Sequence, residues 1–190
     1  MFPNLRLFRS FRPDWYARRV TDISPTWLAA HGLDSLLLDA DCTLKCYRNP
    51  APEPGVMEWL DTLRAANVRL IIVSNGLGGR IRDFADRVNL PVVFRAMKPR
   101  PHGLLRAMRK LDTSPDRTAI AGDQIFADIA AGRRAQVVTI LVEPLAPEEE
   151  HWYTRLKRPL ERRLITSWHH HGTFPPTVKN VETDTSHHID

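Results

Sequence analysis

Two carboxylates separated by one residue, Asp39 and Asp41, end the apolar run "LLLDADCTL" at residues 36–44. Its first residues are typical of a buried strand. Burying two like charges so close together is unfavourable unless a cation, a proton or a shared reaction relieves the repulsion. One carboxylate can attack phosphorus, and a second beside it can act as general acid and base. The pair therefore indicates a bound cation, a shared proton or a shared reaction at this strand end, and the rest of the chain must decide among them.

The elements that position this pair follow from the hydrophobic pattern. Short apolar runs alternate with amphipathic stretches, which predicts an α/β fold with a parallel sheet and helices on both faces. The carboxyl ends of such strands meet at one edge, where ligand sites belong. We expect strands at residues 35–39, 68–75, 91–94, 117–123 and 137–142, and helices at 53–66, 79–88, 101–111 and 124–134.

Other chemically active side chains follow the later strands. Each alone is compatible with an ordinary turn or helix surface, but together, in chain order, they form the set that phosphoryl transfer through an aspartyl phosphate requires. Candidate phosphate-binding residues are Ser74, Asn75 and Lys98, and candidate Mg²⁺ ligands are Asp39, Asp41, Asp123 and Asp128. In this scheme Asp39 is the nucleophile, and Asp41 is the acid and base that also offers its backbone carbonyl to the metal. Thr43 is expected to fix the turn after the first strand.

The segments "DADCT", "VSN", "MKP" and "GDQIFAD" resemble, in order, the four motifs of the haloacid dehalogenase (HAD) superfamily of Mg²⁺-dependent phosphatases with an aspartate nucleophile. The resemblance spans residues 39–128. It implies a Rossmann-like sheet and the same roles: Asp39 and Asp41 in catalysis, Ser74 and Lys98 on the phosphate, and Asp123 with Asp128 at the metal. The second carboxylate of motif one is implied to mark phosphatases within the superfamily.

The spacing of the motifs leaves no room for a cap domain. Ser74 lies 35 residues after Asp39, and Asp123 lies 25 residues after Lys98, each about one helix-and-strand unit. A capless site is open, which suits a large or embedded substrate better than a small soluble ester that must be shielded from water.

The segments "GDQIFADIAAGRRAQVVTILVEPL", "AMKP" and "RPLERRL" resemble the YqeG-type branch, subfamily IIIA, which includes the mitochondrial and plastid phosphatidylglycerophosphate phosphatases. This resemblance implies that phosphatidylglycerophosphate is the substrate. The net charge of +5 and the pI near 9.6 indicate an anionic partner. Arginines with interleaved aromatics at residues 6–19, and a basic run at 155–163, suit peripheral contact with an anionic membrane as well as they suit ordinary solvated charge.

We predict a basic aromatic arm at residues 1–33, a phosphatase domain at 34–165 and a disordered tail at 166–190. Two cysteines without a zinc framework, and the absence of a signal-peptide pattern or a long apolar run, favour a cytoplasmic protein, peripheral on the cytoplasmic membrane.

Three other functions are compatible with parts of this pattern. One is a phosphatase for nucleotides or phosphoproteins. A second is a receiver-like module that accepts phosphate without rapid turnover, although the acid beside Asp39 favours turnover. The third is a nucleic-acid-binding protein, for which the sequence offers no stacking platform or recognisable module. Nucleic acid is therefore not expected as a partner.

Overall fold

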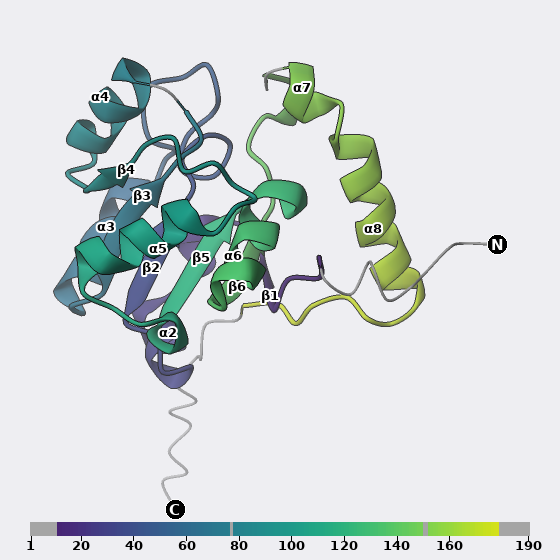
Figure 1. Ribbon diagram of the computed structural model, residues 1–190, viewed down its shortest axis with the longest axis horizontal. Helices are drawn as coiled ribbons and strands as arrows, with labels where there is room; N and C mark the ends of the chain where they lie inside the picture. The colour runs from purple at the N-terminus through teal and green to yellow at the C-terminus, as the bar shows by residue number, and fades with distance from the viewer. Residues whose placement is uncertain (1–10, 77, 150–151, 179–190) are drawn as a thin grey trace, which may run out of the picture.

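Six parallel strands form the centre of the molecule, in the order β1-β6-β5-β2-β3-β4 (Figure 1). This computed structural model describes residues 11–76, 78–149 and 152–178. The strands are β1 (Trp15–Ala17), β2 (Ser35–Leu38), β3 (Arg69–Val73), β4 (Val92–Val93), β5 (Thr118–Gly122) and β6 (Val138–Val142). Strands β2 to β6 confirm the five expected from the sequence, and the parallel α/β class is confirmed with them.

Helices connect the strands and cover both faces of the sheet. They are α2 (Pro25–Ala30), α3 (Val56–Ala65), α4 (Gly79–Arg87), α5 (His102–Leu111), α6 (Ala130–Ala135), α7 (Trp152–Arg155) and α8 (Arg158–His170). Single turns of 3₁₀ helix lie at Val20–Asp22, Pro115–Arg117 and Pro147–Glu149, and a π-helical turn, η3, spans Ile125–Ile129. The helix expected at residues 124–134 is therefore η3 followed by α6.

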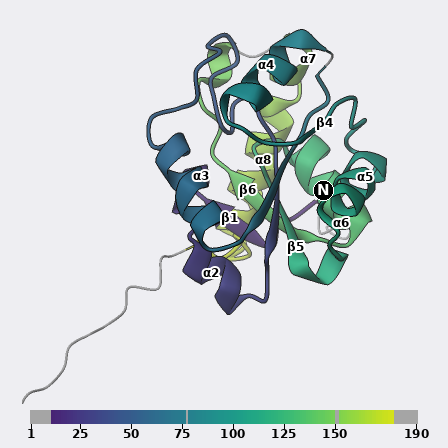
Figure 2. The ribbon, with the colours of Figure 1, turned by 90° about the vertical axis from the view of Figure 1, so that its left-hand side faces the viewer.

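The alternation of side chains along β2 divides the core into layers. Leu36 and Leu38 pack into the cluster that contains α3 and α4, whereas Leu37 packs into the cluster beneath α5 and α6. Figure 2 shows α3 on one side of the strands and α5 with α6 on the other. Because both faces are covered, the two central strands β2 and β5 are buried along their whole length and are mostly apolar, as expected for central parallel strands.

The segment predicted as a separate N-terminal arm is partly built into this core, which corrects the boundary at residue 33. Strand β1 pairs in parallel with β6, with Tyr16 opposite Leu141, and helix α2 buries Trp27 and Leu28. A three-residue strand is too short to show alternation in the sequence, and its aromatic and basic neighbours obscured it. Residues 1–10, the start of the predicted arm, lie outside the described residues.

The tail predicted at residues 166–190 is also partly ordered. Helix α8 continues to His170, and its Leu164 and Trp168 pack with Leu141 and with η3. Beyond it, the Val178 amide donates to the Tyr16 carbonyl at 2.8 Å, which places this segment beside β1. The segment is held by tertiary contacts rather than by a periodic pattern of its own. Residues 179–190 lie outside the described residues.

Between β2 and β3 the chain forms only a loop and α3, and between β4 and β5 only α5 and a 3₁₀ turn. Within the described ranges there is accordingly no separate cap domain over the sheet edge. None of the helices described is long and apolar enough to cross a membrane.

Candidate active site

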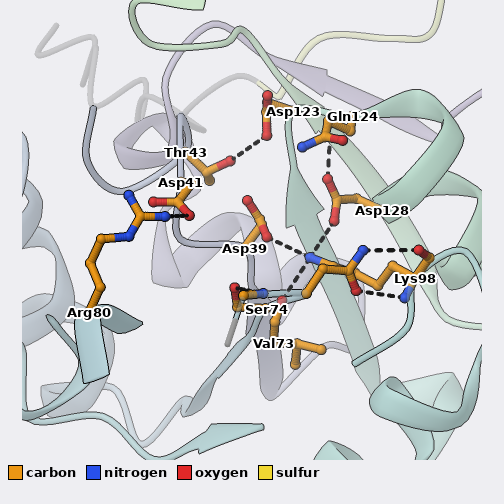
Figure 3. A network of polar contacts seen from close by, with 12 residues as sticks. Asp39, Asp41, Thr43, Val73, Ser74, Arg80, Lys98, Asp123, Gln124 and Asp128 are labelled. Atoms are coloured by element: carbon orange, nitrogen blue, oxygen red, sulfur yellow. Dashed lines mark hydrogen bonds and ion pairs between the residues drawn. The ribbon is translucent and has the colours of Figure 1, made fainter. Parts of the chain in front are cut away.

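Three buried carboxylates converge at the carboxyl edge of the sheet (Figure 3). Asp39 follows β2, Asp123 follows the neighbouring strand β5, and Asp128 lies on η3. One carboxylate oxygen from each lies within 4.8 Å of the other two. The structure therefore brings Asp39 together with Asp123 and Asp128, more than 80 residues later in the sequence, because β2 and β5 are neighbours in the sheet.

The local backbone after β5 explains how Asp128 reaches this position. The π-helical turn brings the Asp128 amide to the Gln124 carbonyl at 2.8 Å, and the Gln124 amide donates to Asp128 Oδ2 at 3.1 Å. A Cβ atom on Gly122 would lie only 2.4 Å from Asp128 Cγ, so residue 122 must lack a side chain. Wide helical turns of this kind are frequent at functional sites.

Lys98 bridges two of the three carboxylates. Its Nζ lies 2.5 Å from Asp39 Oδ1 and 2.6 Å from Asp128 Oδ1, and it donates to the Val73 carbonyl at 2.7 Å. Burial lowers the pKa of Lys98, but the Asp128 and Asp39 carboxylates outweigh burial and raise it above its usual value. Lys98 is therefore a permanent cation at the site.

Asn75 fixes the backbone from which Lys98 projects. The Asn75 amide group donates to the Lys98 carbonyl at 3.0 Å and accepts from the Lys98 amide at 2.7 Å. Asn75 thus positions a phosphate-binding candidate instead of lying free at the strand end. Ser74 is buried beside it, and its hydroxyl accepts from the Gly76 amide at 3.0 Å.

Burial raises the pKa of two of the carboxyl groups despite the nearby cations. Desolvation brings the pKa of Asp39 to about 7, with Lys98 opposing the shift and Asp128 adding to it. Desolvation likewise raises the pKa of Asp123 well above its usual value, with Arg158 opposing the shift. Charge repulsion among the acids contributes in both cases, so an added cation would favour the ionised forms.

A count of charges tests whether a divalent metal fits here. When Asp39, Asp123, Asp128 and Glu161 are all ionised, they face two buried cations, Lys98 and Arg158, which leaves two negative charges for a bound cation to balance. Carboxylate oxygens are the ligands that Mg²⁺ prefers, and a divalent ion balances this excess. The residues present therefore fit a hard divalent cation held by Asp39, Asp123 and Asp128.

Asp41 lies outside this carboxylate trio. Its oxygens pair with Lys45 Nζ at 2.5 Å and with Arg80 Nη2 at 2.8 Å. The tight turn after β2 causes this arrangement, because the Cys42 amide donates to the Lys45 carbonyl at 2.8 Å and so folds residue 45 back beside residue 41. The predicted contribution of Asp41 to the metal is thus limited to its backbone carbonyl, while its side chain is directed towards two cations.

Four site residues were not among the sequence candidates: Lys45, Arg80, Arg158 and Glu161. Lys45 follows Asp41 by four residues and is fully buried, a spacing that is visible in the sequence. Arg80 is the second residue of α4, and its guanidinium also stacks on Tyr47, 4.3 Å from the ring centroid. Thr43, expected only to fix a turn, also donates to Asp123 Oδ1 at 3.3 Å.

Arg158 belongs to the basic run at residues 155–163, for which the sequence predicts exposed charge, yet it is buried. It pairs with Asp123 through Nη2 and donates through Nη1 to the Asp123 carbonyl at 2.8 Å. The quoted segment "RPLERRL" contains both Arg158 and Glu161, but only their tertiary contacts show that they belong to the site.

A parallel sheet with an aspartate nucleophile candidate, a bridging lysine and an acidic cluster at its carboxyl edge defines the architecture of HAD-type phosphatases. The chain belongs to the haloacid dehalogenase-like hydrolase family, whose model matches residues 7–136. Its similarity extends to named phosphatases. It is 29% identical over 161 residues to "Probable phosphatase YqeG" of Bacillus subtilis (strain 168), covering 85% of this chain and 93% of the relative.

It is also 26% identical over 167 residues to the chloroplastic phosphatidylglycerophosphate phosphatase 1 of Chlamydomonas reinhardtii, covering 83% of this chain and 62% of that protein. Among solved structures, 3-deoxy-D-manno-octulosonate 8-phosphate phosphatase from Yersinia pestis aligns with a TM-score of 0.48 at 15% identity, over 62% of this chain and 67% of that one. The family match makes this chain a hydrolase of the HAD family, and the similarity to the Bacillus relative supports phosphatase activity.

Proposed function

We propose that this protein is a Mg²⁺-dependent phosphomonoesterase that acts through an aspartyl phosphate on Asp39, with phosphatidylglycerophosphate as its substrate at an anionic membrane surface. The observation that carries the proposal is the buried cluster of Asp39, Asp123 and Asp128 bridged by Lys98. Bound at this cluster, Mg²⁺ supplies positive charge that stabilises the phosphoryl oxygens in the transition state.

The chain's own residues divide the reaction as follows. Lys98 holds Asp39 Oδ1, so Oδ2 is the oxygen that attacks phosphorus while the bond to the leaving alkoxide breaks. Asp41 gives a proton to that alkoxide. It then takes a proton from the water that cleaves the acyl phosphate, which releases inorganic phosphate and restores the Asp39 carboxylate. Ser74 and Lys98 donate to the phosphoryl oxygens in both steps.

A lipid substrate is supported by features around the site. A cavity of about 660 Å³ adjoins Asp123 and Arg158 between β6 and α8, and apolar side chains such as Leu141, Ile165 and Phe174 line part of it. Such a space suits the apolar part of a large phosphate ester. The relative from Chlamydomonas named for phosphatidylglycerophosphate adds support by similarity.

Membrane contact is supported by the turn between α7 and α8. Leu156 in this turn is 74% exposed, beside the exposed cations Arg155 and Lys157, and Leu160 in the first turn of α8 is 48% exposed. This turn lies at the carboxyl end of the sheet, as Figure 1 shows. A bilayer that contacts the turn would therefore lie at the same end of the molecule as the candidate active site. Each exposed cation near an anionic surface contributes about 1 kcal/mol to binding.

Phosphate release tests the proposal. The purified protein is given phosphatidylglycerophosphate in vesicles, or a panel of soluble phosphomonoesters, with and without Mg²⁺, and the Asp39→Asn variant serves as the blank. Preferred Mg²⁺-dependent turnover of the lipid is the expected result. Turnover restricted to soluble esters, nucleotides or phosphopeptides would refute the lipid assignment, and undiminished turnover by Asp39→Asn would refute the nucleophile.

Membrane contact has its own measurement, which is co-sedimentation with vesicles that contain anionic lipid. Replacing Leu156 and Leu160 together by serine should reduce the bound fraction, because the apolar anchors are lost while the charge is kept. Equal sedimentation of the variant and the original protein would remove this surface from the proposal.

A further inference from the structure

Helix α8 places a buried ion pair directly against the acidic cluster. Arg158 is 7% exposed and Glu161 is 4% exposed, and their side chains pair at 3.0 Å across one turn of the helix. Charged groups are rarely buried this deeply unless they are paired and hydrogen-bonded. The burial of Arg158 and Glu161 therefore cannot be explained by a role as solvated surface charges.

Arg158 contacts Asp123 through two separate interactions. Its Nη2 pairs with Asp123 Oδ2, and its Nη1 donates to the Asp123 backbone carbonyl at 2.8 Å. Because one rigid guanidinium holds both the carboxylate and the backbone of the same residue, it fixes the side-chain torsions of Asp123. The other carboxylate oxygen, Oδ1, is then left on the side of Thr43, whose hydroxyl lies 3.3 Å away.

Glu161 links the same helix to the segment that carries Asp128. Its Oε1 accepts from the Phe126 amide at 3.1 Å, and Phe126 lies within η3. Helix α8 therefore contacts Asp123 directly through Arg158, and contacts η3, the segment that contains Asp128, through Glu161. No part of α8 falls within residues 7–136, the stretch matched by the family model.

We propose that Arg158 and Glu161 are positioning residues that orient Asp123 and η3 for metal binding, so that the C-terminal helix completes the metal site. This inference rests on the Mg²⁺ dependence proposed above and goes beyond it, because it assigns a role to a helix outside the matched family region. Groups that orient metal ligands in this way typically change metal affinity 10- to 100-fold when they are replaced.

Two other roles for Arg158 lead to different results. If Arg158 only stabilises the fold, its loss lowers the melting temperature but leaves the affinity of the folded protein for Mg²⁺ unchanged. If Arg158 instead competes with the metal for Asp123, its loss removes a positive charge and tightens Mg²⁺ binding. A positioning role alone predicts weaker binding by a protein that remains folded.

The test measures binding of Mg²⁺ alone, without substrate, by calorimetric titration and by the Mg²⁺-dependent rise in melting temperature. Arg158→Gln should weaken binding at least tenfold. Arg158→Lys should recover only part of it, because a single ammonium lacks the fork that spans carboxylate and carbonyl. Arg109→Gln, which makes the same charge change on the exposed side of α5, is the matched control and should bind as the original protein does.

Circular dichroism with a chelator present establishes which variants are folded. If Arg158→Gln does not fold, Arg158→Lys and Glu161→Gln carry the test, and each should still bind Mg²⁺ at least threefold more weakly. Unchanged or tighter binding by the folded variants overturns the positioning role while leaving the proposed phosphatase mechanism intact. Failure of the original protein to bind Mg²⁺ overturns the metal dependence, and this inference with it.

Discussion

Replacement of the nucleophile candidate Asp39 by asparagine should stabilise the metal-free protein. The Asp39 carboxyl is buried, and desolvation raises its pKa from 3.8 to about 7 although Lys98 opposes the shift. A carboxyl whose pKa is higher in the folded state binds its proton more tightly there. Stability therefore falls as the pH rises from about 4 to about 7 and stays low above that range.

The size of the effect follows from the shift. A difference of about 3 pKa units at 1.36 kcal/mol per unit gives an upper limit of about 4 kcal/mol for ionising Asp39 in the folded protein. Asparagine removes this ionisation but also weakens the contact with Lys98, so we expect a net gain of about 2 kcal/mol at pH 8. For a chain of this length, that corresponds to a rise of ~4–8 °C in melting temperature.

The assay is thermal unfolding followed by circular dichroism, with a chelator present, between pH 4 and pH 8. The difference between Asp39→Asn and the original protein should be small at pH 4, grow through pH 7 and then level off. Asp86→Asn, an exposed change on α4, should differ by less than about 0.5 kcal/mol at every pH. A variant that is less stable at pH 8 would refute the view that burial of the ionised nucleophile dominates its energetics.

Three further predictions concern two positions in the carboxylate cluster and the ion pairs of Asp34 at the opposite end of β2. Gly122→Ala places a Cβ atom 2.4 Å from Asp128 Cγ. It should therefore lower the free energy of unfolding, measured with urea, by about 1–3 kcal/mol, and weaken Mg²⁺ binding in calorimetry. Lys98→Met leaves Asp39 and Asp128 without their shared counter-charge. It should lower the free energy of unfolding of the metal-free protein, measured with urea, by about 3–5 kcal/mol. Asp34→Asn should lower the free energy of unfolding by about 1 kcal/mol at pH 7. Burial raises the pKa of Asp34, but hydrogen bonds from Arg69, Ser35 and Arg117 together outweigh burial and lower this pKa to about 2. That stability is present above pH 4 and is lost as the pH falls towards 2, which acid unfolding of the two proteins measures.

Each of these predictions has a result that contradicts it. Gly79→Ala, where a Cβ atom has open space, is the control for Gly122→Ala, and equal stability of the two would disprove the close-approach argument. A Lys98→Met protein as stable as the original would show that the carboxylates do not need that cation. A stability difference for Asp34→Asn that persists unchanged at pH 2 would show that its ion pairs with Arg69 and Arg117 are not the cause.

The ends of the strands were predictable because each is identified by a short, continuous stretch of sequence. An apolar run long enough for a buried strand, followed at once by a carboxylate or a hydroxyl, identifies both the element and the chemistry of its end, as at Asp39, Ser74 and Asp123. Since parallel strands align their carboxyl ends, the convergence of these residues followed from the fold class alone. The close-packed trio with Asp128 is consistent with that expectation.

The partners of these residues could not be read from the sequence, because they depend on contacts between distant segments. Arg158 looks like one surface cation among several until α8 folds back and buries it against Asp123, 35 residues earlier in the chain. Likewise β1 is too short to show a pattern, and only its pairing with β6 makes it a strand. The sequence by itself determined the five strands β2 to β6, the catalytic candidates and their chemistry, since these depend on local composition and periodicity. Only the tertiary structure decided which charges compensate one another, because burial and distance across the fold set the electrostatic free energy of each group.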